Sequence, residues 1–471
     1  MFCPLVGSKN SSSSLAPQTP HSALEKTKEA TRESWRHLAA GFALLGVLTS
    51  LSLTVYMGSA IALAALALTA VFFTYVFFIE NGRSSKSSPL RVIDGIYKEL
   101  QKTFSFSSSR PSRASSFEEI SLLPPIKQIV ISGGGAKGAV LPGAFRALLK
   151  DSPDLIENTE HLFGSSVGAL FAALVATGIS REGLKIIQQS NLNELLGEKP
   201  IYKDGKELMH FLRQWMRVNI LSQLLQLPEE RKRAFHEKEP FLADEMMKQL
   251  LEAPLEEACI SFRMLAYLHI IYPSAFKDLS VTATKKEGGQ FIFDAQRTPD
   301  TDVALACRAS ASLPIVFDPV QMVYQGETLT LFDGGLIDNI PVALVEEKKG
   351  KPAERVSDKT LVFVFEKQSD FPSVFHPENP NAPYRANFQT RLLRDEVIPR
   401  VAGFTLPTSY TVLRSELLNK IKNQYRHVIS FRVDLKTRDF HKASKHPKKY
   451  SRIGKEAVRN FLAQRAAVRN L

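Results

Sequence analysis

Cysteine is scarce in this sequence, which excludes two kinds of cross-link. Three cysteines, Cys3, Cys259 and Cys307, are scattered over 471 residues. They are too few and too widely spaced for a disulfide framework or a four-thiolate zinc site, and such usage is typical of a protein kept in reducing surroundings. The sequence also has no Asp-rich calcium loop, and we expect no cofactor. Its 44% hydrophobic content excludes a wholly disordered chain.

Charge is absent from one long stretch near the N-terminus. Leu38 to Ile79 form 42 consecutive uncharged residues, whereas one bilayer crossing needs about 20. Gly58 and Ser59 divide the run into two segments, each about 30 Å long as a helix. We therefore expect a hairpin of two transmembrane helices over residues 38–79.

Basic residues stand on both sides of this run. They are Lys26, Lys28, Arg32 and Arg36 before it, and Arg83, Lys86 and Arg91 after it. By the positive-inside rule, both flanks are expected on the cytoplasmic side of the membrane. A cleaved signal peptide is disfavoured, because it would start nearer Met1 with an apolar region of only about 7 to 15 residues. A buried pair of core helices and insertion into a lipid monolayer remain alternatives.

Composition divides the rest of the chain. Residues 1–37 are expected to be flexible, and residues 80–125 form a Ser-rich linker. From residue 126, short β-like runs alternate with helical ones, which predicts an α/β domain with a mainly parallel central sheet. We assign this domain to residues 126–346, with a helical insertion at about 180–272, and its C-terminal part to residues 347–471.

A glycine-rich segment, Gly133 to Gly138, follows the predicted strand Gln128 to Ser132 and precedes a helix. Adjacent glycines let successive backbone N–H groups face one anion at a helix N-terminus. The segment also fits the dinucleotide pattern G-x-G-x-x-G, but the next strand lacks the terminal acidic residue that a ribose requires. A Walker loop is excluded, because Ala139 stands where that motif needs lysine.

A second motif contains a candidate nucleophile. Gly164 to Gly168 read G-x-S-x-G between a predicted strand and an apolar helix. Glycines Gly164 and Gly168 on both sides are what a sharp turn needs if Ser166 is to present its hydroxyl. The alternative is a Ser/Gly turn that only caps the helix.

The serine needs a base, and Asp333 is the best candidate. It ends a β-like run and precedes Gly334 and Gly335. An ordinary Asp-Gly turn is the alternative. None of the ten histidines stands in a recognisable triad setting, and His161 is placed within a strand.

Together these segments resemble the patatin-like phospholipases, a family of lipid acyl hydrolases. Two further stretches, Ala309 to Phe317 and Asn339 to Val342, also resemble the family. Thr437 to Phe440 and the helix after Tyr450 resemble the end of the same domain in bacterial members. The resemblance implies a three-layer α/β hydrolase domain that needs no metal. It also implies a Ser-Asp dyad, in which Ser166 attacks an ester carbonyl and Asp333 takes the proton. With an ordinary pKa near 3.9, such a base would depend more on geometry than on basicity.

The same resemblance assigns roles to the glycine-rich segment. Gly133, Gly134 and Gly135 would form the oxyanion hole, with the N–H groups of Gly134 and Gly135 as the favoured donors. Lys137 has two readings, a solvated or helix-entry side chain and a cation that contacts a phospholipid head group.

The C-terminus is strongly basic. Residues 436–471 contain eleven Lys or Arg and two acidic residues, out of a net charge of +12 for the chain. Tyr450 to Arg469 are amphipathic at helical spacing, which predicts a helix that closes the domain. Lys442, Lys445, Lys448 and Lys449 would also attract anionic lipid. Nucleic-acid binding is not predicted, because no nucleic-acid module accompanies the charges.

The sequence as a whole favours a membrane-associated phospholipase or lysophospholipase. The alternatives are an acylglycerol lipase on lipid droplets and a membrane tether whose hydrolase fold is silent or needs a protein activator. Reducing cysteine usage, the hairpin and the Ser-rich ends also suit a bacterial protein delivered into a host cell.

Overall fold

The computed structural model describes residues 125–190, 202–254, 256–349, 356–367, 392–405 and 410–469. The expected hairpin over 38–79, the N-terminal segment and nearly all of the Ser-rich linker lie outside these residues. Within the described ranges, no helix combines the length and the apolar character that a membrane crossing requires.

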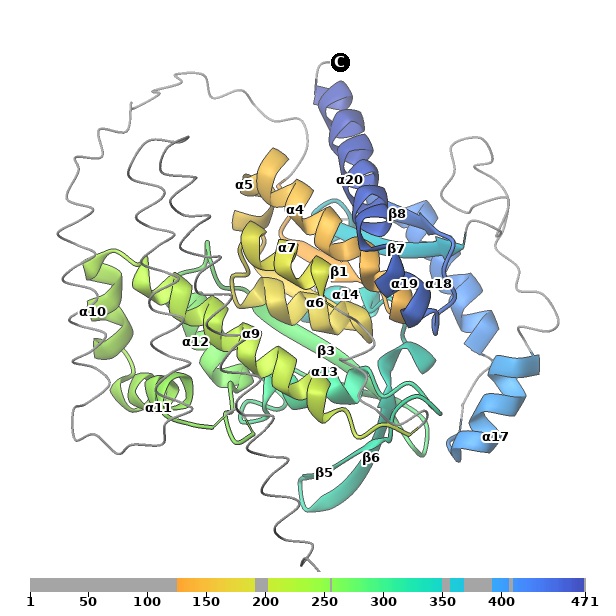
Figure 1. The fold of residues 1–471 in the computed structure, drawn as a ribbon, viewed down its shortest axis with the longest axis horizontal. Helices are drawn as coiled ribbons and strands as arrows, with labels where there is room; N and C mark the ends of the chain where they lie inside the picture. The colour runs from red at the N-terminus through yellow and green to blue at the C-terminus, as the bar shows by residue number, and fades with distance from the viewer. Residues whose placement is uncertain are drawn as a thin grey trace, which may run out of the picture. The chain divides into compact units, whose positions relative to one another are not determined.

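A mainly parallel sheet forms the centre of the molecule (Figure 1). Its strands lie in the order β5-β6-β3-β2-β1-β7-β8, and β4 pairs with β3. The strands are β1 (Gln128–Ile131), β2 (His161–Ser165), β3 (Asp278–Lys285), β4 (Gln290–Phe293), β5 (Val320–Tyr324), β6 (Glu327–Asp333), β7 (Thr360–Lys367) and β8 (His427–Val433). Strands β3, β2, β1, β7 and β8 pair in parallel, whereas β4, β5 and β6 pair antiparallel. This confirms the predicted α/β fold.

Helices cover both faces of the sheet. Those in the first half of the fold are η1 (Gly135–Val140), α4 (Leu141–Asp151), α5 (Pro153–Glu157), α6 (Val167–Ala176), α7 (Arg181–Gln189), α9 (Lys206–Leu225), α10 (Glu229–Glu237), α11 (Pro240–Leu251), α12 (Phe262–Ile271) and α13 (Val303–Ser310). Those that follow are η2 (Gly334–Leu336), α14 (Val342–Lys349), η3 (Leu392–Val397), α17 (Ile398–Ala402), α18 (Tyr410–Gln424), α19 (Phe440–Lys445) and α20 (Pro447–Arg469).

Strand β1 shows how the sequence builds the two layers. Its residues are completely buried, and successive side chains point to opposite faces of a sheet. Ile129 and Ile131 belong to a large apolar core that also includes α4, α6 and α20. Val130, between them, belongs to a smaller core with residues of α14 and α18. The run of apolar residues in β1 therefore reflects burial on both faces, as expected for a parallel sheet.

The stretch 180–272 is helical but serves two cores. Helix α7 buries Leu184 and Ile187 in the main core, beside α4. Helices α9 to α12 share a separate apolar core around Phe235, Met246 and Leu268. Figure 1 shows α10 and α11 at the far side of the molecule from α19. Helices α9 and α12 also contribute residues to the main core, among them Leu212 and Leu265, so they join this second core to the α/β layers.

Candidate active site

Ser166 lies at a sharp turn between β2 and α6. Its backbone has φ 54° and ψ −128°, a conformation that non-glycine residues rarely adopt. Its N–H donates to the hydroxyl oxygen of Ser310 at 2.8 Å, and its carbonyl accepts from Ala169 N–H at 2.9 Å. These bonds hold a strained turn that points the hydroxyl away from the sheet.

Gly168 permits the close approach that this turn requires. A Cβ at this position would lie 2.2 Å from the carbonyl oxygen of Ile131 and 2.7 Å from that of Ser132. Helix α6 therefore begins directly against the end of β1, which only glycine allows. Ser165, one residue before the nucleophile, is completely buried within β2.

Asp333 is brought to Ser166 by the sheet. It ends β6, which pairs with β3, and β3 pairs with β2 on its other side. Its Oδ2 accepts a hydrogen bond from Ser166 Oγ at 2.6 Å, and its Oδ1 accepts from Gly335 N–H at 2.8 Å. Its own N–H donates to the carbonyl oxygen of Ser312 at 3.0 Å. The two residues singled out from the sequence are thus in direct contact.

Burial changes the acidity of this aspartate. The side chain of Asp333 is 4% exposed, and burial raises its pKa to about 6, although the bonds from Ser166 and Gly335 act in the opposite direction. The carboxylate is therefore a better base than an ordinary aspartate. The expected pKa near 3.9 does not apply to this site.

The glycine-rich segment offers two free donors. Gly133 N–H donates to the carbonyl oxygen of Asn339 at 2.9 Å, and Asn339 Nδ2 donates back to Gly133 O at 3.2 Å. Ala136 N–H donates to Thr437 O at 2.9 Å. Between them, the N–H groups of Gly134 and Gly135 have no acceptor among the described residues. The Gly133 N–H is thus already bonded, whereas the two N–H groups that the sequence favours as oxyanion donors are not.

The backbone conformation at position 135 requires glycine. Its φ is +55°, and a Cβ there would lie 2.3 Å from the carbonyl oxygen of Thr437. Gly135 also lines the same pocket as Ser166.

Two other side chains considered from the sequence lie apart from the dyad. The His161 Nε2 is 3.0 Å from Ser280 Oγ on the neighbouring strand, so this histidine belongs to the sheet. Lys137 is 6% exposed and does not line the pocket beside Ser166. A head-group contact by Lys137 is therefore not supported.

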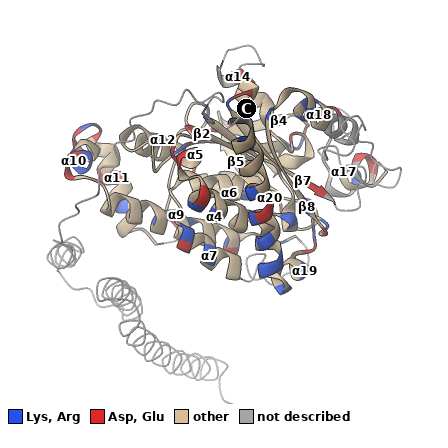
Figure 2. Cartoon of the chain, turned by 90° about the horizontal axis from the view of Figure 1, so that it is seen from above, with Lys and Arg blue, Asp and Glu red and all other residues tan. Residues whose placement is uncertain are grey.

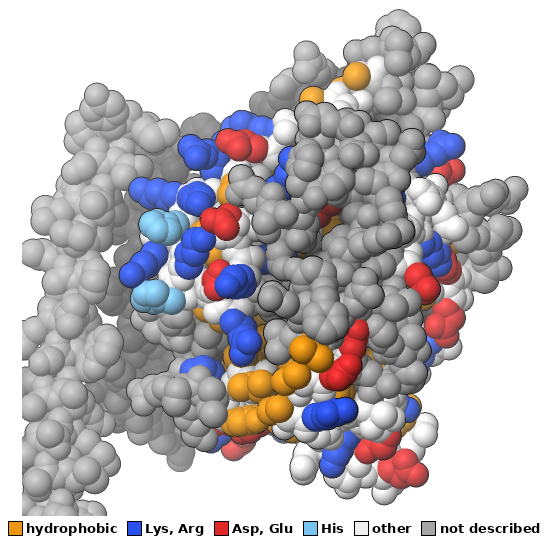
Figure 3. Space-filling view, turned by 90° about the vertical axis from the view of Figure 1, so that its right-hand side faces the viewer, with side chains coloured by type: hydrophobic (Ala, Val, Ile, Leu, Met, Phe, Trp, Pro, Cys, Tyr) orange, Lys and Arg blue, Asp and Glu red, His pale blue; other side chains and the backbone are white. Residues whose placement is uncertain are grey.

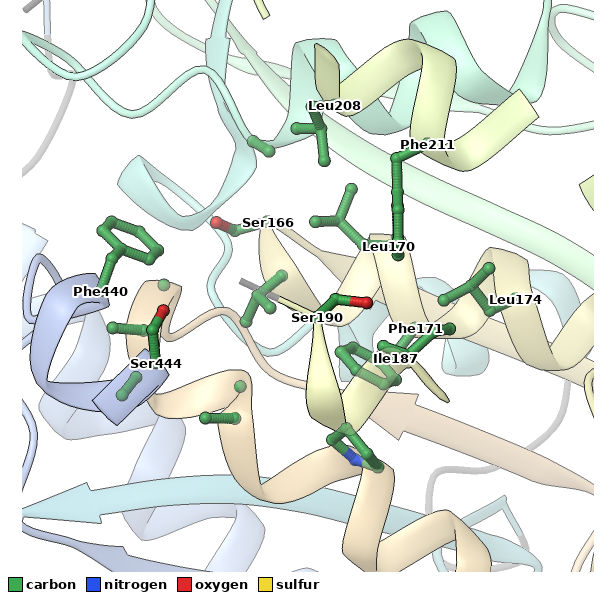
Figure 4. Close-up of a pocket in the computed structure, with 18 of the residues that line it drawn as sticks. Ser166, Leu170, Phe171, Leu174, Ile187, Ser190, Leu208, Phe211, Phe440 and Ser444 are labelled. Atoms are coloured by element: carbon green, nitrogen blue, oxygen red, sulfur yellow. The ribbon is translucent and has the colours of Figure 1, made fainter. Parts of the chain in front are cut away.

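A long apolar pocket extends from Ser166 (Figure 4). Its empty space is about 1070 Å³, part of which is open to solvent. Helices α6, α7 and α9 supply one part of its apolar wall, with Leu170, Leu174, Ile187, Leu208 and Phe211. The segment before β5 supplies another part, with Leu313, Val316 and Phe317. Phe440 and Ala443 of α19 complete the wall near the serine. The Ser166 hydroxyl thus borders an apolar space that suits a hydrocarbon chain.

Three contributors to the site had no assigned role at the level of sequence. Ser310 accepts from the nucleophile's N–H, Asn339 clamps Gly133, and Thr437 accepts from Ala136. All three residues lie in stretches that resemble the family, and this resemblance was their only signal in the sequence. Among the described residues, no group of three or more His, Cys, Asp or Glu side chains could hold a metal ion.

Comparison with known proteins agrees with this geometry. Residues 129–345 match the family model "Patatin-like phospholipase". An uncharacterized protein, YqhO of Bacillus subtilis, is 25% identical over 224 residues, which cover 47% of this chain and 68% of YqhO.

Two solved bacterial structures are also similar. VipD of Legionella pneumophila is 18% identical with a TM-score of 0.46, covering 72% of this chain and 67% of VipD. ExoU of Pseudomonas aeruginosa, in its heterodimeric complex with SpcU from the type III secretion system, is 21% identical with a TM-score of 0.41. That match covers 73% of this chain and 52% of ExoU. The resemblance inferred from the three motifs is confirmed by the family match, which places a patatin-like phospholipase domain at residues 129–345 of this chain.

Proposed function

We propose that this protein hydrolyses acyl ester bonds of phospholipids or lysophospholipids through a Ser166–Asp333 dyad. The observation that carries the proposal is the 2.6 Å hydrogen bond from Ser166 Oγ to Asp333 Oδ2 at one end of an apolar pocket. A serine hydroxyl is a weak nucleophile unless an adjacent base accepts its proton. The pocket would hold the acyl chain while the hydroxyl meets the ester carbonyl.

The reaction proceeds in two halves. Ser166 Oγ attacks the carbonyl carbon as its proton passes to Asp333, and collapse of the tetrahedral intermediate breaks the ester bond. Asp333 returns the proton to the departing alcohol, which leaves an acyl-serine. Water, deprotonated by Asp333, then attacks the acyl-serine and releases the fatty acid together with free Ser166. No metal takes part in this scheme.

The negative charge of each tetrahedral intermediate requires donors in place beforehand. The free N–H groups of Gly134 and Gly135 are suited to this role, since both belong to the segment beside Ser166. Removal of one such donor in other enzymes costs roughly 3 to 4 kcal/mol of transition-state stabilisation. Asn339 would act as a positioning residue, because it holds Gly133 from both sides.

The direct test is hydrolysis of phosphatidylcholine by the purified full-length chain. Ser166→Ala and Asp333→Asn are each expected to lower the rate by about a thousandfold or more, because each removes one half of the dyad. Fatty acid release is measured by mass spectrometry, with triolein as a parallel substrate to detect an acylglycerol lipase. Undiminished release by Ser166→Ala would overturn the mechanism.

The pH profile tests the role of Asp333 as base. The carboxylate must be ionised to accept a proton, so kcat/KM should fall as pH drops through about 6 and reach a plateau above it. Asp338 provides a matched control, because burial also raises its pKa to about 6, while its oxygen accepts from Gln290 instead of Ser166. Asp338→Asn should retain the acidic limb of the profile. If the acidic limb disappeared in Asp338→Asn, the limb would belong to Asp338 and not to Asp333.

Ser310 is predicted to position the nucleophile. In Ser310→Ala, the buried N–H of Ser166 loses its acceptor and the strained turn relaxes, so kcat should fall by about ten- to a hundredfold with KM little changed. Ser280→Ala is the control, because it also removes a buried hydroxyl from this domain, bonded to His161 rather than to the turn. Equal losses of kcat in the two variants would show a general effect on stability. Kinetics with a soluble nitrophenyl ester and thermal unfolding separate these outcomes.

The pocket predicts selectivity for acyl length. Leu170 and Leu174 lie one and two turns along α6 from Ser166, so Leu174 is about 12 Å from it along the helix axis. Leu174→Phe should shorten the pocket and lower hydrolysis of nitrophenyl palmitate about tenfold relative to nitrophenyl butyrate. Nitrophenyl butyrate is the internal control for folding of the variant. An unchanged ratio would place the acyl chain elsewhere.

A further inference from the structure

A single short segment of the chain carries both a wall of the pocket and a cluster of positive charge. Phe440, Ala443, Ser444 and Pro447 line the pocket that contains Ser166. The residues between and after them form an exposed face that we call the basic face, made of His441, Lys442, Lys445, His446, Lys448 and Lys449. Figure 2 shows Lys and Arg along α19 and the adjoining part of α20, and Figure 3 shows Lys, Arg and His side chains gathered on one side of the molecule.

The same segment of the chain also contacts the glycine-rich segment, Gly133 to Gly138. Thr437, just before α19, accepts the Ala136 N–H at 2.9 Å, and Gly135 lies against the same residue. The basic face is therefore fixed in position relative to the proposed oxyanion donors and to the pocket, rather than lying on a remote surface.

Little acidic charge opposes the basic face. Asp434 pairs with Lys442 at 2.9 Å and also attracts Lys449, while Glu456 lies 3.7 Å from Arg452. Asp439 accepts a hydrogen bond from the N–H of Lys436. Lys445 and Lys448 have no acidic partner in the part of the chain that the structure describes. The face thus retains net positive charge that points outward.

We propose that the basic face docks the enzyme on anionic bilayers and presents the pocket to the lipid. The proposal rests on the proposed function, since it names the surface that would bring the pocket to its lipid substrate. Each lysine near a negatively charged lipid surface adds to the attraction, and this attraction is screened by salt. A bilayer has a hydrocarbon interior and, in this case, anionic head groups. The same segment of the chain offers an apolar pocket wall for the first and a lysine cluster for the second. A nucleic acid would match only the positive charge of the basic face, and it would have no use for the adjoining apolar pocket.

The test compares two kinds of vesicle with the full-length chain. One is phosphatidylcholine alone, and the other includes about one-third phosphatidylserine. The variant Lys445→Glu/Lys448→Glu/Lys449→Glu should lose at least about tenfold of the rate on the anionic vesicles and remain near wild type on pure phosphatidylcholine. Raising the NaCl concentration to about 1 M should reduce the wild-type preference in the same direction. The N-terminal region, with its own basic residues, is the same in the variant and in the wild type, so a change in the ratio of rates between the two proteins isolates the basic face.

A matched triple variant controls for the change in charge. Arg233, Lys238 and Lys248 are exposed on or next to α10 and α11, away from the pocket, and Arg233→Glu/Lys238→Glu/Lys248→Glu changes the net charge equally. This control should keep the wild-type ratio of rates. Hydrolysis of soluble nitrophenyl butyrate by both variants shows that each is folded.

The outcomes separate this proposal from the proposed function. An equal loss in both triple variants, or an unchanged ratio in the α19–α20 variant while Ser166-dependent hydrolysis persists, would overturn the docking role only. If no ester is hydrolysed, docking can still be tested by flotation of the proteins with the same vesicles. The α19–α20 variant should then bind anionic vesicles at least about tenfold more weakly than the control variant. Binding to RNA that the α19–α20 variant loses, with vesicle binding unaltered, would assign the face to nucleic acid instead.

Discussion

The contact between the Ser166 hydroxyl and the buried Asp333 carboxylate is the constraint on which the rest of the site depends. A carboxylate removed from water is costly unless it is hydrogen-bonded, and here Ser166 and Gly335 each supply one donor. The incomplete compensation leaves the pKa of Asp333 raised, which is what gives a carboxylate useful basicity. The strained turn at Ser166, the pairing of β6 with β3 and the Ser310 hydroxyl all maintain this contact.

The sequence singled out Ser166 and Asp333, which the fold brings into contact, because both residues stand in local motifs at strand ends. Strand β3 was not predicted, because Ser280, Thr282 and Thr284 interrupt its apolar residues although all three are buried. Ser280 and Thr284 find partners in His161 and Asp333, which are distant in the sequence. Such tertiary hydrogen bonds leave no periodic pattern along the chain.

The same limit applies to the finer chemistry of the site. The resemblance placed Gly133, Gly134 and Gly135 in the oxyanion hole and favoured the last two as donors, but only the folded chain reveals that the Gly133 N–H is bonded to the Asn339 carbonyl. The raised pKa of Asp333 likewise results from burial by several elements at once. The position of α19 beside the pocket depends on β8 lying at the edge of the sheet next to β7, which no local motif encodes.

The order of the strands along the chain determines the stage of synthesis at which the site can form. Ser166 and Asp333 are 167 residues apart in the chain, and β3, which pairs with the strands of both, lies between them. A ribosome-bound or unfolded chain therefore holds the serine without its base. The contact between Ser166 and Asp333 can therefore form only after the chain has been made and folded beyond residue 333.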